Sequence, residues 1–236
     1  MGYSGADAGN YSVNSTTSGT ASINQRTLVV SATGVGRTYD GTTDITVKLK
    51  DNRVTGDALT LSYDTAILAS KAAGTQSVSV AGINVTGNDV GNYTFNTTAT
   101  TTAAIAKLVI SGSVTISDKV YDGSTRGTIA TRSLTGVLPG DVVNLANGAA
   151  SFSDKNVATG KPVNVTNLGL SGADAGNYSV NSTTSGTASI TKRTLLITAT
   201  AANKKYDGTT TASVTLADNR VTGDQITLSY AAASFA

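Results

Sequence analysis

The sequence predicts an all-β protein made of tandem antiparallel β-sandwich repeats of about 82 residues, which together form an elongated rod. Three observations lead to this prediction. Thr, Ser, Gly, Ala, Asn and Val dominate the composition, apolar residues alternate with polar ones, and two motifs recur with a common period. β-Branched residues favour strands, and Gly, Asn and Asp favour the turns that connect them.

The composition excludes several kinds of catalytic site. The 236 residues contain no His, Cys or Trp, and all 15 acidic residues are Asp. A chain without imidazole or thiol groups has no histidine base, no cysteine nucleophile, no disulfide and no ordinary zinc or haem site. A net charge of +2 gives no basic stripe for a phosphate backbone, so no nucleic-acid partner is expected. We therefore expect a protein that is not an enzyme.

The sequence also predicts no membrane span and no targeting segment of its own. No apolar run approaches the ~20 residues that a membrane helix needs, and the first residues lack the basic and apolar regions of a signal peptide. If the protein is secreted, its signal is expected to lie outside this sequence.

Two motifs define the repeat. The triplet Tyr-Asp-Gly occurs as Tyr39-Asp40-Gly41, Tyr121-Asp122-Gly123 and Tyr206-Asp207-Gly208, at spacings of 121−39=82 and 206−121=85. A second motif, Gly-x-Asp-x-Gly-Asn-Tyr, keeps both spacings and carries Asp7 and Tyr11, Asp89 and Tyr93, and Asp174 and Tyr178. In addition, the twenty residues from Ser4 to Ile23 recur unchanged from Ser171 to Ile190.

The order of the motifs divides the chain into four parts. Residues 1–25 correspond to the C-terminal part of one repeat, 26–106 and 107–191 to two complete repeats, and 192–236 to the N-terminal half of another. A period this long suits a small domain with its own core rather than one turn of a solenoid. A domain of ~80 residues is marginally stable alone, so neighbouring repeats are expected to be partners.

Alternating segments place the strands within a repeat. Apolar residues alternate over 45–49, 59–61 and 78–80, and again over 163–165, 212–216 and 226–228. Each Tyr-Asp-Gly triplet lies between extended segments, where Asp-Gly favours a two-residue type I′ hairpin turn. Only Ala106 and Lys107 separate Ile105 from Leu108, so the last strand of one repeat is expected to run into the first strand of the next.

The second motif resembles a feature of immunoglobulin-like sandwiches. Asp174-Ala175-Gly176-Asn177-Tyr178 precedes a strand and is similar to the tyrosine corner, in which the tyrosine hydroxyl bonds to backbone a few residues upstream. The resemblance implies an immunoglobulin-like sandwich. Because the Cys pair and core Trp of antibody domains are missing, only the architecture is carried over, and the strand order stays open.

The repeats resemble a known family. Tandem units that share (R/K)-x-YDG, DNRVTGD and (S/T)G-x-D-x-GNY are similar to the YDG/MBG-type repeats of large bacterial surface adhesins, including filamentous-haemagglutinin-like exoproteins exported by two-partner secretion. The middle repeat departs from the pattern, because Arg132 to Asp141 (RSLTGVLPGD) replaces DNRVTGD. The resemblance implies a secreted, cell-surface, non-enzymatic stalk.

Candidate sites are few, and each has a structural alternative. Asp7, Asp89 and Asp174, together with the aspartates of the Tyr-Asp-Gly triplets, could bind Ca²⁺, but turn capping is the favoured interpretation because a dense calcium loop is missing. No other cofactor is expected. Lys71 and Lys155 share one repeat position where an isopeptide bond could form, and a solvated lysine is favoured there. Asn-x-Ser/Thr sequons leave glycosylation open.

Three functions follow as hypotheses. The first is a stalk that spaces an adhesive tip from the cell surface. The second is a module whose repeats bind carbohydrate or a cell, which is disfavoured because Trp is absent and the tyrosines belong to repeat-defining motifs. The third is a filament in which residues 1–25 of one molecule complete residues 192–236 of another by head-to-tail strand addition. The ligand of the tip is not defined by the sequence.

Overall fold

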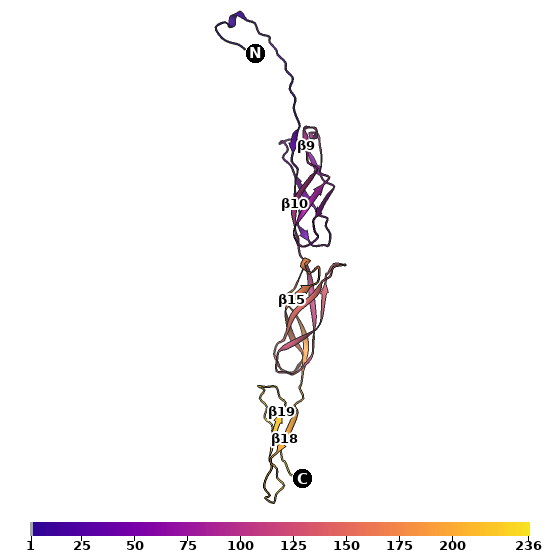
Figure 1. The fold of residues 1–236 in the computed structure, drawn as a ribbon, viewed down its shortest axis with the longest axis vertical. Coiled ribbons are helices and arrows are strands. Elements are labelled where there is room, and N and C mark those ends of the chain that lie inside the picture. The colour runs from indigo at the N-terminus through magenta and orange to yellow at the C-terminus, as the bar shows by residue number, and fades with distance from the viewer. Residues whose placement is uncertain (1) are drawn as a thin grey trace. The chain divides into compact units, whose positions relative to one another are not determined.

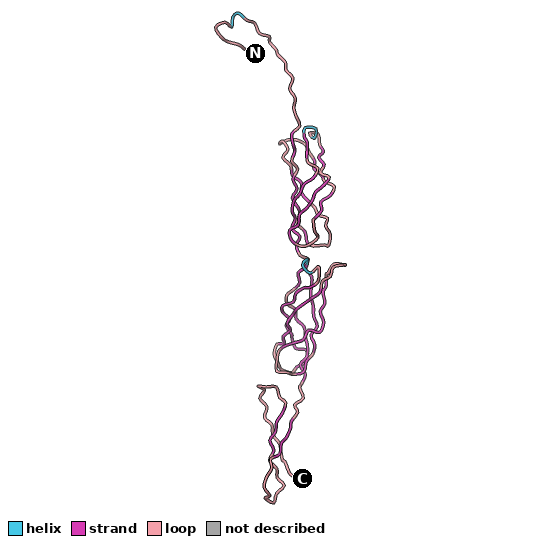
Figure 2. Tube along the Cα trace, viewed as in Figure 1, coloured by secondary structure: helices cyan, strands magenta, loops and turns pink. Residues whose placement is uncertain are grey.

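The computed structural model describes residues 2–236 and confirms that the protein is all-β (Figure 1). In this part of the chain there is no α-helix, and the helical segments in Figure 2 are single 3-10 turns. They are η1 (Ala8–Asn10), η2 (Val90–Asn92) and η3 (Ala175–Asn177). Residues 2–236 hold no helix with the length and apolar character needed to span a bilayer.

The chain forms two compact units, and the first repeat contributes to both. The first unit contains the segments up to Val35, Thr43–Ser70 and Thr75–Ala104. The second unit contains Ile105–Ala236 and also two segments of the first repeat, Gly36–Thr42 and Lys71–Gly74. β3 (Arg37–Thr38) with the turn after it, and the loop that leads into β7 (Gly74–Ala81), therefore belong to the second unit.

Most strands of the first unit are short. The antiparallel pairs are β2 with β4, β5 with β8, and β6 with β7, whereas β1 and β9 are parallel. The bounds are β1 (Arg26–Leu28), β2 (Ser31–Gly34), β4 (Val47–Lys50), β5 (Thr60–Ser62), β6 (Thr65–Leu68), β7 (Gly74–Ala81), β8 (Asn84–Thr86), β9 (Tyr93–Phe95) and β10 (Thr98–Ala106).

The second unit is built on a seven-stranded sheet with the order β12-β17-β15-β14-β13-β11-β16. A separate pair, β18 and β19, belongs to the residues that follow. The bounds are β3 (Arg37–Thr38), β11 (Leu108–Ser117), β12 (Lys119–Val120), β13 (Arg126–Thr135), β14 (Asn144–Phe152), β15 (Ala158–Ser171), β16 (Tyr178–Val180), β17 (Thr184–Thr191), β18 (Ile197–Ala201) and β19 (Val214–Asp218).

The prediction of antiparallel pairing is confirmed for most strand pairs but not for all of them. β11 pairs with β16 in parallel, and β12 pairs with β17 in parallel, as β1 pairs with β9 and β3 with β10 in the first repeat. The cause is connectivity. The opening strand of a repeat is a neighbour of strands that come some 70 residues later in the chain, so no tight turn fixes an antiparallel direction.

A strip of apolar side chains from alternate strand positions forms the core of the second unit. Val163 and Val165 on β15 are fully buried, and the alternating residue Asn164 is exposed. The buried cluster consists of Leu145, Ala150, Phe152, Val163, Val165, Leu168, Ala188 and Ile190. Burial of a Val or Leu side chain contributes roughly 1.5–3 kcal/mol, so this strip stabilises the unit.

The alternating segments mostly become strands. Those at 45–49, 59–61, 78–80, 163–165 and 212–216 overlap β4, β5, β7, β15 and β19. The segment 226–228 is not a strand, although the equivalent residues of the first repeat form β5 and pair with β8. Within the described residues 226–228 has no counterpart of β8 to pair with, so it lacks the cross-strand hydrogen bonds that extended backbone requires.

Candidate functional site

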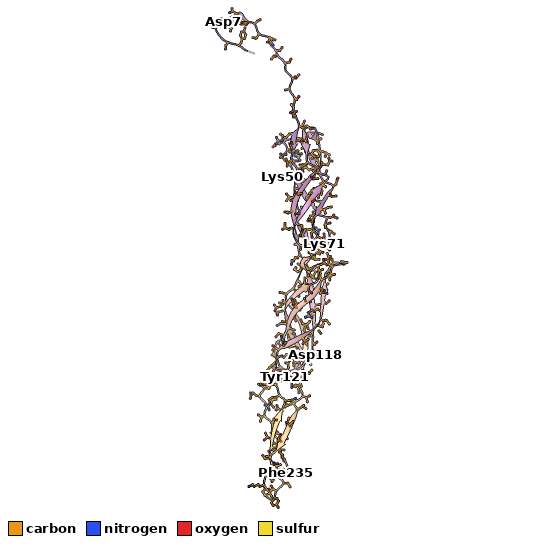
Figure 3. The ribbon with its side chains drawn as sticks, viewed as in Figure 1. Asp7, Lys50, Lys71, Asp118, Tyr121 and Phe235 are labelled. Atoms are coloured by element: carbon orange, nitrogen blue, oxygen red, sulfur yellow. The ribbon has the colours of Figure 1, made fainter. Side chains whose placement is uncertain are left out.

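A cluster of polar contacts in the second unit surrounds Asp141, in the loop before β14. The Tyr178 hydroxyl donates to Asp141 Oδ2 at 2.6 Å, and the Tyr39 hydroxyl donates to the same oxygen at 2.7 Å. Lys71 Nζ, labelled in Figure 3, lies 3.2 Å from Asp141 Oδ1. We call this cluster of Tyr39, Lys71, Asp141 and Tyr178 the first seam, because it joins two consecutive repeats.

The first seam excludes water from a charged group. The Asp141 side chain is 6% exposed, and the Tyr39 and Tyr178 rings meet edge to face with centroids 5.5 Å apart. Lys71 Nζ lies 5.9 Å from the centroid of the Tyr39 ring, within the range of a cation–π contact. Charge-assisted hydrogen bonds are about twice as strong as neutral ones. The Asp141 carboxylate therefore binds Tyr39 and Lys71 of the preceding repeat strongly.

The contacts of the first seam shift the pKa of each member. The hydrogen bond from Tyr178 holds the pKa of Asp141 below its usual value, with further contributions from Tyr39 and Lys71. Burial, and then the neighbouring carboxylate, raises the pKa of Tyr178 to about 12 and also raises the pKa of Tyr39. The tyrosine and the carboxylate raise the pKa of Lys71. At neutral pH the seam therefore holds a carboxylate, an ammonium group and two neutral phenols.

The same contacts recur one repeat later. The Tyr121 hydroxyl donates to Asp224 Oδ1 at 2.8 Å, and Lys155 Nζ lies 3.2 Å from the same oxygen. Lys155 Nζ is 6.0 Å from the centroid of the Tyr121 ring. We call Tyr121, Lys155 and Asp224 the second seam. Two independent examples show that the contact belongs to the repeat.

An apolar contact and a backbone hydrogen bond accompany the seams. A Cβ atom added to Gly123 would lie 2.7 Å from Val221 Cγ1, so glycine is needed for this close approach. In the first seam, Gly41 lies in the same way against Leu138. The backbone N–H of Ala73 donates to Asn177 Oδ1 at 2.9 Å, which satisfies a buried amide.

Local sequence shapes the Tyr-Asp-Gly turn that presents each tyrosine. The aspartate accepts a hydrogen bond from the backbone N–H two residues on, as in an Asx turn. These bonds join Asp40 to Thr42, Asp122 to Ser124 and Asp207 to Thr209, at 2.9, 2.9 and 3.0 Å. A basic residue three positions before each aspartate pairs with it, and Lys119 lowers the pKa of Asp122 to about 2.

The prediction of a type I′ hairpin at these triplets is wrong. A type I′ turn needs positive φ at both central residues, but among the described residues only Asn147 and Asn167 have positive φ besides glycines. Gly41 has φ +81° and Asp40 does not share it. The flanking strands also have different partners, since β3 pairs with β10 and β4 pairs with β2. The Asx turn replaces the hairpin because the aspartate side chain supplies the acceptor.

The tyrosines of the second motif differ from a tyrosine corner. Tyr178 Oη accepts from the backbone N–H of Leu138 at 3.1 Å, and Tyr93 Oη accepts from that of Val54 at 3.0 Å. Each hydroxyl also donates to the nearby aspartate, Asp141 or Asp57. These partners lie 36–40 residues upstream rather than a few, so the tyrosine ties the end of the repeat to its Gly-Asp loop.

The aspartates proposed as calcium ligands lie apart from the seams. Asp89 Oδ2 accepts from the backbone N–H of Ala58 at 2.8 Å, and Asp174 Oδ2 accepts from that of Val142 at 2.9 Å. Asp7 is exposed at the start of η1, in the segment before β1. Within residues 2–236 no group of three acidic side chains is placed to hold a metal ion.

Sequence reasoning missed the acceptors of the seams. Asp224 is the last residue of the second DNRVTGD, and Asp141 ends the divergent RSLTGVLPGD. The surviving Gly-Asp pair was the available signal. The sequence favours a solvated lysine over an isopeptide bond at Lys71 and Lys155, whereas in the structure each ammonium group pairs with an aspartate of the next repeat.

Comparison with known proteins gives one family. The model of the YDG domain matches the chain twice, over residues 24–104 and 104–186. Among curated proteins, none matches the chain. The two matches together cover more than half of the sequence.

Proposed function

Because the chain belongs to the YDG domain family, we propose that it is a non-enzymatic extender that spaces an adhesive tip from a bacterial cell surface. The observation that carries the proposal is the repetition of the seam, in which a Tyr-Asp-Gly tyrosine and a lysine of one repeat hold an aspartate of the next. An extender needs such contacts at every junction. If the junctions were flexible, each added domain would increase the conformational freedom of the chain more than its end-to-end distance.

The connection between repeats supports the same role. One residue, Lys107, separates β10 from β11, which is too short for a flexible linker. We also propose that each repeat is an immunoglobulin-like sandwich, because the apolar strip of the second unit has the alternation expected of strands that pack face to face. Secretion and cell-surface location belong to the proposal through the adhesin-like motifs.

Stiffness at the first seam tests the extender. The chain has no cysteine, so spin labels can be attached at Lys50→Cys and Ser133→Cys, two exposed strand positions in consecutive repeats. Double electron–electron resonance should give a narrow distance distribution, which Asp141→Asn should broaden because Lys71 and both hydroxyls lose their charged partner. Asp44→Asn, at an exposed aspartate, is the matched control and should change nothing.

Two results would contradict the extender. One is a parent distribution as broad as that of the same repeats joined by a Gly-Ser linker. The other is an Asp141→Asn distribution identical to the parent's. Should Asp141→Asn unfold, Tyr39→Phe removes a single hydroxyl and keeps the ring contact, so the comparison can still be made.

Carbohydrate binding by the repeats is the competing proposal. Sugar-binding clefts use accessible aromatic rings, whereas Tyr39 and Tyr178 are buried in the first seam. A glycan array probed with the intact chain should show no binding. A specific signal that survives Tyr206→Phe and Tyr11→Phe, at two exposed tyrosines, would favour a binding module in place of the extender.

A further inference from the structure

In each complete repeat the opening strands lie beside the closing strands and run in the same direction. In the second repeat β11 pairs in parallel with β16, and β12 pairs in parallel with β17. The backbone N–H of Tyr121 donates to the Thr191 carbonyl at 2.9 Å and so extends the second of these pairs. The first repeat has the same arrangement, with β1 beside β9, β3 beside β10, and Tyr39 donating to the Ala106 carbonyl at 2.8 Å.

An asparagine three residues after the tyrosine of the second motif joins the same strands. Asn181 Oδ1 accepts from the backbone N–H of Gly112 at 2.7 Å, and Asn181 Nδ2 donates to the Gly112 carbonyl at 3.1 Å. Asn96 makes the same two bonds with Val30, at 2.8 and 2.9 Å. The side chain thus supplies a donor and an acceptor to the opening strand just after β16 or β9 has ended. In the second repeat we call the two parallel strand pairs and this asparagine bridge the parallel clamp.

The points where the chain enters and leaves the repeat decide how tension acts on the parallel clamp. The chain enters at Leu108, at the start of β11, and leaves at Thr191, at the end of β17. Leu108 pairs with Tyr178 at the start of the closing strands, whereas Val120 pairs with Thr191 at their end. β11 alone has 10 residues and spans ~33 Å at ~3.3 Å per residue, so entry and exit lie at opposite ends of the clamp. Tension between them pulls the opening and closing strands past each other along their length.

This direction loads the hydrogen bonds of the clamp together. Each bond lies across the direction in which the strands would slide, so the strands cannot move until several bonds break in one step. Strands that are pulled apart from one end lose their bonds one after another. A hydrogen bond contributes about 0.5–1.5 kcal/mol, so breaking several at once gives the higher barrier. Forced unfolding is governed by the rate of unfolding, which this barrier sets.

We propose that each complete repeat is a module that resists tension, in which parallel opening and closing strands and the asparagine bridge hold the fold against a pull along the chain. Only Lys107 separates β10 from β11, so tension in the closing strand of the first repeat passes directly into the opening strand of the second. This function goes beyond the extender and does not depend on it, because a repeat could resist tension even if its junctions were flexible.

Pulling single molecules of the full chain in two directions tests the proposal. The chain has no cysteine, so handles can be attached through thiols at chosen exposed positions. Lys107→Cys with Lys192→Cys pulls along the strands, from the entry of the second repeat to its exit. Val120→Cys with Lys192→Cys pulls β12 and β17 apart from one end, and Val120 is 56% exposed. At one loading rate, the unfolding force in the first direction should be severalfold higher than in the second.

Equal forces in the two directions, or a lower force along the strands, would overturn the proposal. Both proteins share the handle at Lys192, so a difference between them reports the direction of pull on the same strands. Neither result bears on the extender, which is tested by stiffness at the first seam.

The asparagine bridge can be tested in the same experiment. Asn181→Ala removes both bonds to Gly112 and should raise the unfolding rate under constant force along 107–192 about tenfold, as expected for the loss of ~1.4 kcal/mol from the barrier. In the second direction the rate should not change, because the bonds between β12 and β17 break first. Asn164→Ala, at an exposed residue of β15 outside the clamp, is the matched control and should change neither rate.

An equal rise in both directions would show that Asn181 stabilises the repeat without resisting tension, and would overturn its part in the proposal. Should Asn181→Ala fail to fold, Asn181→Asp keeps the acceptor for the Gly112 N–H and loses only the donor, so the same comparison can be made.

Discussion

A single carboxylate oxygen receives two phenol hydroxyls in the first seam, from residues 102 and 37 positions away in the chain. Asp141 can accept both because a carboxylate has about four lone-pair sites and needs no proton of its own. Asparagine at this position would keep the shape but would lose the charge that Lys71 opposes. The chemistry of the junction therefore depends on ionisation as well as on fit.

Alkaline pH should weaken the fold through Tyr178. Its pKa is raised from 10.0 to about 12, so the neutral phenol is favoured in the folded state. This stabilisation is complete below pH 10 and is lost as the pH rises through about 12, because the unfolded chain ionises first. Thermal melting from pH 9 to 12 should show a steeper loss of stability for the parent than for Tyr178→Phe. Parallel curves for the two proteins would contradict the raised pKa.

At the scale of elements, glycines with positive φ set the loops that lead into the second motif. Gly172 follows β15 with φ +112°, and a Cβ there would lie 2.3 Å from the Val142 carbonyl oxygen. Gly87 follows β8 with φ +131° and meets Ala58 in the same way. Each glycine lets the loop approach closely enough for the aspartate of the second motif to accept a backbone hydrogen bond. Asp89 accepts from Ala58, and Asp174 accepts from Val142.

Gly172→Ala should therefore destabilise the second unit by about 1–3 kcal/mol or more, from backbone strain and the close contact with Val142. The matched control is Gly176→Ala in η3, where nothing lies within 4 Å of the added Cβ and φ is not positive. Chemical denaturation of the two variants gives the comparison. Equal midpoints would show that the loop can move aside without cost.

The elements could be predicted from the sequence only in part. Alternation at Val163 and Val165 identified β15, and the repeat located every tyrosine of the seams. Strand direction and the partners of the seam were not predictable, because both depend on residues 70–100 positions apart that no local pattern links. The twenty residues shared by 4–23 and 171–190 show this limit directly. The later copy forms η3, β16 and β17 with Ile190 buried, whereas the earlier copy forms η1 and leaves Ile23 exposed.

At the scale of the whole molecule, the described residues differ in how many partners they have. β15 has strand neighbours on both sides and fully buried valines, whereas every residue of β18 is exposed and β19 is its only strand partner in the described chain. A domain that buries so little apolar surface gains little stability of its own. β18 and β19 are thus expected to be less stable than β15.

Hydrogen–deuterium exchange should reveal this difference. Amides of residues 197–201 and 214–218 should exchange much faster than those of 163–170, because few contacts protect them. Equal protection of β15 and β18 would contradict the ranking.

The seam has a direction, since every repeat offers a tyrosine and a lysine toward the next repeat and an aspartate toward the one before. If one whole repeat were removed or duplicated, the tyrosine and lysine of one repeat would again meet the aspartate of the repeat that follows it. Every junction between repeats would still have its donors and its acceptor. The identical stretches 4–23 and 171–190 lie two repeats apart, so exchanging one for the other would change the chain by whole repeats. A chain with more or fewer repeats would then need no new kind of interface.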